Sequence, residues 1–279
     1  MEMITNTNTE ITSASFQWRD HDGVCALVCE PLEKDGFANA FSTRLGGVSP
    51  MPQGALNLAG FNEDDADNIH ENRRRFLKVV DGDWTLTGCW QMHSGDVRTV
   101  RDHEDARRDT EHCDALVTDA PRILLAVKTA DCVPILLGDT QSGACAAVHA
   151  GWRGTLVSIL PRALEQMTRE YGTLPTDVRA AIGPAARSCC YEVGAEVIES
   201  FKKDFPDSAN LFKATRAGHA LVDLQRANRE QLIEAGILPE RIHTAPLCTM
   251  CRTDLFFSYR REKSLYGRTG RLMSVVGRC

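Results

Sequence analysis

Residues 115–150 read ALVTDAPRILLAVKTADCVPILLGDTQSGACAAVHA, and this stretch decides the fold class. It holds four short apolar runs, at 115–118, 123–128, 134–137 and 144–149, separated by turn-forming residues. Runs of this length and composition are typical of strands. A doubly wound parallel sheet needs a helix between most of its strands, and these connections leave no room for one. The stretch therefore predicts an α+β fold.

Before and after this stretch, the sequence predicts further short strands together with helices. Further strands are expected at 24–29, 36–41, 85–91, 97–101, 178–182 and 241–247, and helices at 67–80, 155–171, 195–205 and 224–235. Between 42 and 60 a Gly-, Pro- and Ser-rich stretch predicts a long loop. No internal repeat or linker divides the chain. We therefore expect one domain over 23–279, preceded by a polar, aperiodic and flexible leader over 1–22.

Composition narrows the class of partner. The 279 residues carry a net charge of −6 and a pI of about 5.8, which argues against a nucleic acid or an anionic membrane as partner. The N-terminal stretch lacks the basic and apolar regions of a secretory signal, and no apolar run approaches the ~20 residues of a membrane span. We expect a cytoplasmic protein whose eleven cysteines are reduced thiols, most of them buried.

One cysteine pair has a suggestive spacing. Cys248-Thr-Met-Cys251 has the C-x-x-C pattern of a zinc knuckle or a redox pair. A knuckle needs two more ligands, yet the chain has no second C-x-x-C, and the adjacent Cys189 and Cys190 suit neither geometry. These four cysteines are therefore expected to be structural or incidental.

Three other residues stand at transitions from strand to loop, where rigid elements present side chains outward. They are His93 in CWQMHSGDV, Cys132 in VKTADCVPILL and His149 in ACAAVHAGWRG. Two imidazoles and a thiolate form a three-ligand set for Zn²⁺ with a fourth position open to water or substrate. Without metal, the same trio is a thiol nucleophile with a histidine base, or simply part of the core. The spacing alone does not decide between these interpretations.

Several arginines are candidates for anion binding because a guanidinium matches the geometry of phosphate. Arg44 opens the Gly-rich loop, Arg153 precedes an expected helix, and Arg260 belongs to a second cationic cluster near the C-terminus. The alternative is that these side chains pair with surface carboxylates.

Taken in order, the sequence frames resemble the YfiH-like family, also called laccase-domain or polyphenol-oxidase-like proteins. The resemblance runs through FSTRLGGVS, HENRRRF, QMHSGDV, CDALVTD, TADCVPILLGD, AAVHAGWRG, AAIGPAARSCCYEVG and FFSYRRE, and it covers the chain after the leader. Two positions depart from the family pattern: Ala185 replaces a common cysteine, and Ser158 replaces the usual glycine.

The resemblance implies a single α+β domain with central mixed β-sheet layers flanked by helices. It also implies that His93, Cys132 and His149 are the catalytic and metal-binding residues, with Zn²⁺ as cofactor and Cu²⁺ as the other candidate metal. The family's activities include phosphorolysis of adenosine, inosine and methylthioadenosine, adenosine deamination, copper-dependent phenol oxidation, and correction of peptidoglycan precursors.

The number and spacing of the histidines help to choose among these activities. The chain has eight histidines and no H-x-H pair, which disfavours multicopper oxygen reduction. We therefore expect a zinc-dependent purine nucleoside phosphorylase with adenosine deaminase activity, whose partners are purine nucleosides and phosphate. The alternatives are a cysteine hydrolase acting on peptidoglycan precursors, a copper-dependent polyphenol oxidase, and a binding protein without catalysis.

Substrate contacts are expected around the trio. Arg44 and Arg153 are the expected anion site, with Arg260 nearby, and Asn57 and Tyr259 are pocket candidates. Asp131, which precedes Cys132 in the chain, is a candidate proton shuttle for deamination.

Overall fold

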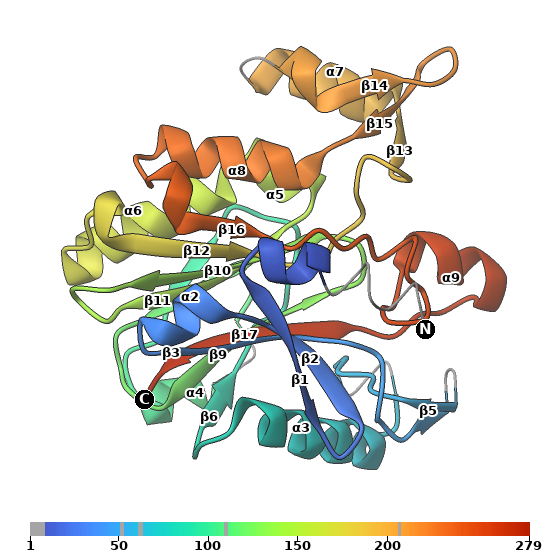
Figure 1. Cartoon of the computed structure of the whole chain (residues 1–279). Helices are drawn as coiled ribbons and strands as arrows, with labels where there is room; N and C mark the ends of the chain where they lie inside the picture. Colours follow the sequence, from blue (N-terminus) through green and yellow to red (C-terminus); the bar gives the residue numbers. More distant parts are fainter. Residues whose placement is uncertain (1–8, 51–52, 61–63, 109–110, 206–207) are drawn as a thin grey trace.

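The fold is built on two six-stranded sheets that pack face to face (Figure 1). The computed structural model describes residues 9–50, 53–60, 64–108, 111–205 and 208–279. The first sheet contains, in spatial order, β1 (Phe16–His21), β2 (Val24–Cys29), β3 (Phe37–Ser42), β17 (Leu272–Arg278), β9 (Ile123–Thr129) and β6 (Thr85–Thr87). The second contains β16 (Ile242–Thr244), β12 (Val178–Ile182), β10 (Val133–Asp139), β11 (Cys145–Ala150), β8 (Ala115–Thr118) and β7 (Val97–Thr99).

Both sheets are mixed. Most neighbouring strands are antiparallel, but β6 pairs with β9, β7 with β8, and β12 with β16 in parallel. The four runs of 115–150 fall on β8 to β11, and they divide between the sheets because β9 belongs to the first sheet and the other three to the second. The α+β class with central mixed sheet layers is thus confirmed.

Alternation along β10 shows how the layers are joined. Leu136 packs between the sheets with Leu125 and Ala147, whereas Ile135 and Leu137 point to the opposite face and contact helices. This is the two-residue period of a strand whose two faces are both buried.

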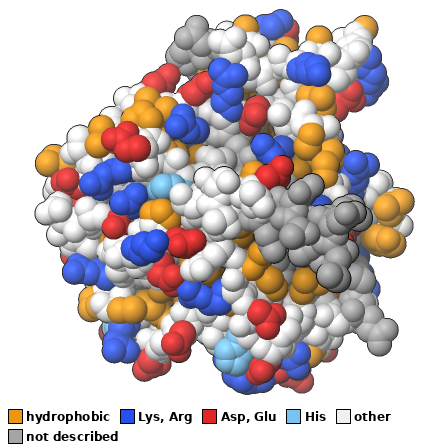
Figure 2. All heavy atoms as spheres, viewed as in Figure 1, with side chains coloured by type: hydrophobic (Ala, Val, Ile, Leu, Met, Phe, Trp, Pro, Cys, Tyr) orange, Lys and Arg blue, Asp and Glu red, His pale blue; other side chains and the backbone are white. Residues whose placement is uncertain are grey.

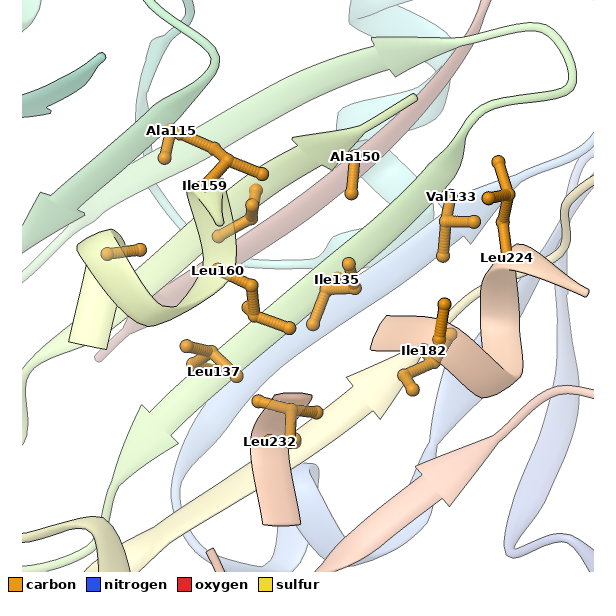
Figure 3. Close-up of a cluster of buried hydrophobic side chains, with 14 of the residues drawn as sticks. Ala115, Val133, Ile135, Leu137, Ala150, Ile159, Leu160, Ile182, Leu224 and Leu232 are labelled. Carbon is orange, nitrogen blue, oxygen red and sulfur yellow. The ribbon is translucent and has the colours of Figure 1, made fainter. Parts of the chain in front are cut away.

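Helices cover the outer faces of both sheets. The chain forms helices α2 (Glu30–Lys34), α3 (Ala66–Val80), α4 (His103–Ala106), α5 (Trp152–Leu156), α6 (Ile159–Tyr171), α7 (Ala195–Asp204), α8 (Leu224–Glu234) and α9 (Tyr259–Tyr266). Of these, α3 covers the first sheet, and α5, α6 and α8 cover the second. Phe76 and Val79 of α3 pack on the first sheet. Ile159 and Leu160 of α6, together with Leu232 of α8, pack on the second (Figure 3).

Smaller elements complete the chain. A three-stranded sheet of β13 (Glu192–Gly194), β15 (His219–Val222) and β14 (Phe212–Ala214) accompanies α7 at one end of the molecule (Figure 1). Short 3₁₀ turns lie at Pro175–Asp177, Ser208–Leu211 and Pro239–Arg241. The predicted loop at 42–60 contains a short pair, β4 (Ser49–Pro50) and β5 (Gln53–Ala55), and its residues 51–52 lie outside the described part.

The leader expected over 1–22 differs from the structure in its second half. Ile11 and Phe16 are buried, and β1 pairs along its whole length with β2. Only Phe16 of β1 is fully buried and the last two residues, Asp20 and His21, are exposed, so the segment lacks the apolar run that predicts a strand. Residues 1–8 lie outside the described residues.

The helix expected over 155–171 is two helices. Ser158 adopts the left-handed conformation at φ 58° and separates α5 from α6, and Pro161 falls in the first turn of α6. A proline is tolerated there because the first N–H groups of a helix have no partner within it.

No helix within the described residues combines the length and the apolar character needed to cross a membrane. On the face of the molecule in Figure 2, acidic and basic side chains are intermingled.

Candidate active site and metal centre

The three residues predicted from their sequence frames lie together. The ligand atoms of His93, Cys132 and His149 are all within 4.8 Å of one another, and the ring centroids of the two histidines are 4.9 Å apart. His149 is buried, Cys132 is half-buried, and His93 is exposed. The cluster therefore opens to solvent on the side of His93.

The sheet register explains the meeting of Cys132 and His149. In the antiparallel pair β10–β11, Val133 lies opposite Ala150 and Pro134 opposite His149. Cys132 immediately precedes β10, so it emerges beside the end of β11. His93 reaches the same place from the loop between β6 and β7.

Asp114 organises the cluster, a role that its sequence frame does not predict. It is fully buried, and its carboxylate accepts the Nδ1–H of His149 at 2.7 Å. The same carboxylate accepts backbone N–H groups of Met92, His93 and Ser94 at 3.1, 3.0 and 2.6 Å. One acidic side chain thus fixes both histidine-bearing segments. The only local signal was an acidic residue at the start of a buried strand, in CDALVTD.

These contacts shift the acid–base properties of the group. Burial opposes ionisation of Asp114, but hydrogen bonds from His149 and Ser94 lower its pKa to about 2. Burial alone would favour neutral His149, yet Cys132 and Asp114 raise the pKa of His149 to about 9. Burial and the neighbouring His149 lower the pKa of His93. Asp114 is consequently the negative group of the site, held ionised behind His149.

A glycine leaves space in front of the three donors. A Cβ built on Gly151 would lie 3.0 Å from the Cys132 Sγ and 3.2 Å from the His93 Nδ1. Any side chain at this position would therefore crowd the donor atoms. Two residues of the site also have positive φ values, His93 at 59° and Asp131 at 93°. Such conformations cost about 1–3 kcal/mol and persist only where the surroundings enforce them.

A cavity of about 240 Å³ lies beside the cluster, lined by residues that include Trp152, Tyr191 and Arg260. Trp152 follows Gly151 directly. Burial and the nearby Cys132 raise the pKa of Tyr191 to about 12. The cavity and the three donors are therefore neighbours.

Positive side chains surround this region. Arg153 stacks on Trp152 with 4.0 Å between its guanidinium carbon and the ring centroid, and Arg260 stacks on Tyr191 at 5.1 Å. Arg153 and Arg271 both act to lower the pKa of His93, which places their charges near the open side of the cluster. Arg271 was not predicted, because an arginine close to the C-terminus carries no local signal of its destination.

Arg44 is placed differently from its expected role in anion binding. Its guanidinium forms a buried ion pair with Glu262 at 2.6 Å, donates to the carbonyl of Thr253 and lies over the Phe257 ring. Its charge is thereby neutralised within the fold. It lines a separate cavity of about 660 Å³ together with residues of α9.

The pocket candidates Asn57 and Tyr259 play supporting parts. Asn57 is buried, and its side-chain oxygen accepts the backbone N–H of Arg271 at 2.9 Å. Tyr259 is half exposed at the start of α9, with the Arg271 guanidinium 5.9 Å from its ring. Both residues therefore hold Arg271, and through it the open side of the site.

Asp131, the candidate proton shuttle, has its oxygens occupied. It accepts hydrogen bonds from the Thr249 hydroxyl at 2.7 Å, the Ser258 hydroxyl at 3.0 Å and the Arg260 N–H at 2.8 Å. These contacts fix the loop that carries Cys132.

Four of the other cysteines also lie together in the fold. Cys189, Cys190, Cys248 and Cys251 form a second group of thiols within 4.8 Å of one another. The adjacent Cys189 and Cys190, whose spacing was expected to suit neither a zinc knuckle nor a redox pair, thus lie beside the C-x-x-C pair. Chain topology, rather than sequence spacing, brings the four thiols together.

Comparison with known proteins places this site in a family. The family model described as "Multi-copper polyphenol oxidoreductase laccase" matches residues 38–279. The chain belongs to this family. The resemblance to YfiH-like proteins is also confirmed: the chain is 35% identical to "Purine nucleoside phosphorylase YlmD" of Geobacillus stearothermophilus, over 87% of this chain and 90% of that protein.

Two further relatives of this laccase-like family are informative. "Adenosine deaminase RL5", from an unknown prokaryotic organism, is 36% identical over 85% of this chain and 96% of its own length. The crystal structure of YlmD from Geobacillus stearothermophilus superposes with a TM-score of 0.85 at 33% identity, covering 95% of this chain and 98% of that one. The relatives' names support an enzyme acting in purine nucleoside chemistry.

Proposed function

We propose that this protein is a zinc-dependent purine nucleoside phosphorylase with adenosine deaminase activity, acting through His93, Cys132 and His149. The carrying observation is the meeting of these three donors, from separate loops and strands, within 4.8 Å. Relatives named as purine nucleoside phosphorylases and as an adenosine deaminase support the choice of substrate.

The residues fit a metal ion. Two imidazole nitrogens and a thiolate are a donor set that suits Zn²⁺ and also Cu²⁺. The Asp114–His149 hydrogen bond occupies Nδ1, so Nε2 is the nitrogen that would bind a metal ion, as in carboxylate–histidine–metal arrangements. The missing side chain of Gly151 keeps the space in front of the donors clear. A zinc ion bound there supplies a Lewis acid and lowers the pKa of a bound water.

Other side chains would orient the metal ligand, bind the purine and bind the phosphate. Asp114 orients His149 and neutralises part of the charge in the site. Trp152 and Tyr191 offer aromatic surface to a purine in the cavity of about 240 Å³. Arg260 lines this cavity, and Arg153 stacks on Trp152, another of its lining residues. These two arginines are the proposed phosphate contacts, in place of Arg44. Phosphorolysis and deamination would share one substrate site.

The decisive variant is Cys132→Ser, which replaces a soft thiolate ligand with a hydroxyl. We expect it to lower bound zinc, and to lower phosphate-dependent release of hypoxanthine from inosine by more than the roughly 10–100-fold that loss of a supporting partner costs. Metal analysis and turnover are measured on the same sample. Cys279→Ser, at the exposed C-terminal residue, is the matched control. Full activity and unchanged metal in Cys132→Ser would contradict the proposal.

One observation favours a second candidate, a cysteine hydrolase acting on amide bonds such as those of peptidoglycan precursors. The thiol of Cys132 lies close to His149 and raises the pKa of that imidazole, as expected of a nucleophile placed beside its base. Labelling with iodoacetamide separates the two candidates. The phosphorylase predicts that saturating zinc protects Cys132 from alkylation, whereas the hydrolase predicts that it does not.

A further inference from the structure

Two loops bring the group of four cysteines together at the end of the second sheet. The strands β12 and β16 are parallel neighbours, with Ala180 opposite Ile242, so their chains leave the sheet at the same edge. The following loops stay side by side: Ala185 forms an isolated parallel bridge with Cys248, and the Thr249 N–H donates to the Ala185 carbonyl at 3.0 Å.

Each loop then folds into a tight turn that presents two thiols. The Cys190 N–H donates to the Arg187 carbonyl at 3.0 Å, and the Arg252 N–H donates to the Cys248 carbonyl at 3.0 Å. Cys189 and Cys190 project from the first turn, and Cys248 and Cys251 from the second. The Sγ of Cys251 lies 2.9 Å from that of Cys190 and 3.5 Å from that of Cys189.

The geometry points to a second metal centre: we propose that Cys189, Cys190, Cys248 and Cys251 together bind one Zn²⁺. Four thiolates at a Zn–S distance of about 2.3 Å stand about 3.8 Å apart at the corners of a tetrahedron. The Cys251 Sγ lies 2.9 and 3.5 Å from two of the other sulfur atoms, and all four lie within 4.8 Å of one another, so small side-chain movements reach this arrangement. Four protein ligands leave no open position, which makes this a structural site rather than a catalytic one.

This zinc would also support the loop of Cys132. The Thr249 hydroxyl donates to the Asp131 carboxylate at 2.7 Å, and the Ala186 N–H donates to the Asp131 carbonyl at 2.9 Å. Both cysteine-bearing loops therefore hold Asp131, whose φ of 93° needs outside support. The proposal stands on the four thiols and does not depend on the proposed function.

The test measures metal stoichiometry in the full-length protein, purified with a phosphine reductant. Cys251→Ser removes the last ligand of the second turn, and Cys279→Ser is again the control, a substitution of an exposed cysteine outside the group. We expect Cys251→Ser to lose one equivalent of zinc relative to the control. X-ray absorption on the Cys132→Ser variant, in which the other candidate site is impaired, should show a zinc shell of four sulfur atoms and no nitrogen.

Two results would overturn the proposal. One is equal zinc content in Cys251→Ser and Cys279→Ser. The other is a disulfide between Cys190 and Cys251, found by mass spectrometry in freshly purified, metal-free wild type that takes up no sulfur-coordinated zinc after reduction. If Cys251→Ser does not fold, as judged by circular dichroism, the sulfur-only shell of Cys132→Ser decides the question alone.

Discussion

At the scale of single residues, the site depends on Asp114, a fully buried carboxylate that holds His149. Asp114→Asn keeps the shape of the side chain but places an amide N–H among groups that already donate, including Nδ1 of His149 and the Ser94 N–H. We expect metal affinity to fall about 10–100-fold, because the wrong tautomer of His149 is favoured. A competitive zinc chelator titration measures this.

Asp139→Asn is the matched control for that change. Asp139 is as buried as Asp114 and also accepts backbone N–H groups, from Gln141 and Ser142 in the turn between β10 and β11. Its loss should reduce the free energy of unfolding by about 1–3 kcal/mol while metal affinity stays unchanged. Equal loss of affinity in both variants would show that Asp114 acts through stability alone.

At the scale of elements, the boundary between α5 and α6 is a test of backbone conformation. Ser158 has φ 58° and its side chain caps nothing. A left-handed conformation costs an L-residue about 1–2 kcal/mol, part of which glycine gives back as unfolded-state entropy. Ser158→Gly should therefore raise the free energy of unfolding by about 0.5–1 kcal/mol, measured by urea denaturation. Ser158→Ala keeps the Cβ and should give no such gain.

The same elements show what the sequence could and could not predict. The strands β8 to β11 could be predicted because they are short apolar runs. The helix α3 could be predicted because acidic residues precede its first turn and basic residues lie toward its end. The pairing of Cys132 with His149 follows from register between β10 and β11, which spacing does not encode. The meeting of the four cysteines could not be predicted for the same reason: β12 and β16 are far apart in the chain, and their parallel pairing aligns the loops that follow them.

At the scale of the whole molecule, the layered core must carry stability without disulfides, because all eleven cysteines are free thiols in the structure. The residue contacts that join layers are mostly apolar, as with Leu136 between the sheets. Buried carboxylates are the exceptions, and each is surrounded by donors. Protonation of these carboxylates therefore makes the free energy of unfolding depend on pH.

Acid should destabilise the metal-free protein, and protonation of Asp139 should account for part of the loss. Burial opposes ionisation of Asp139, but hydrogen bonds from Ser142 and Gln141 hold its pKa below the usual value of 3.8. A lowered pKa in the folded state means that Asp139 contributes its full stabilisation above pH 3.8, and that this is lost as pH falls through the folded-state pKa. Asp131, whose pKa is raised by burial, acts with the opposite sign. Urea unfolding of the metal-free protein as pH falls from about 5 to 2 should show a smaller loss in Asp139→Asn than in wild type. Parallel curves for the two proteins would mean that the pKa of Asp139 does not change on folding, and would contradict this prediction.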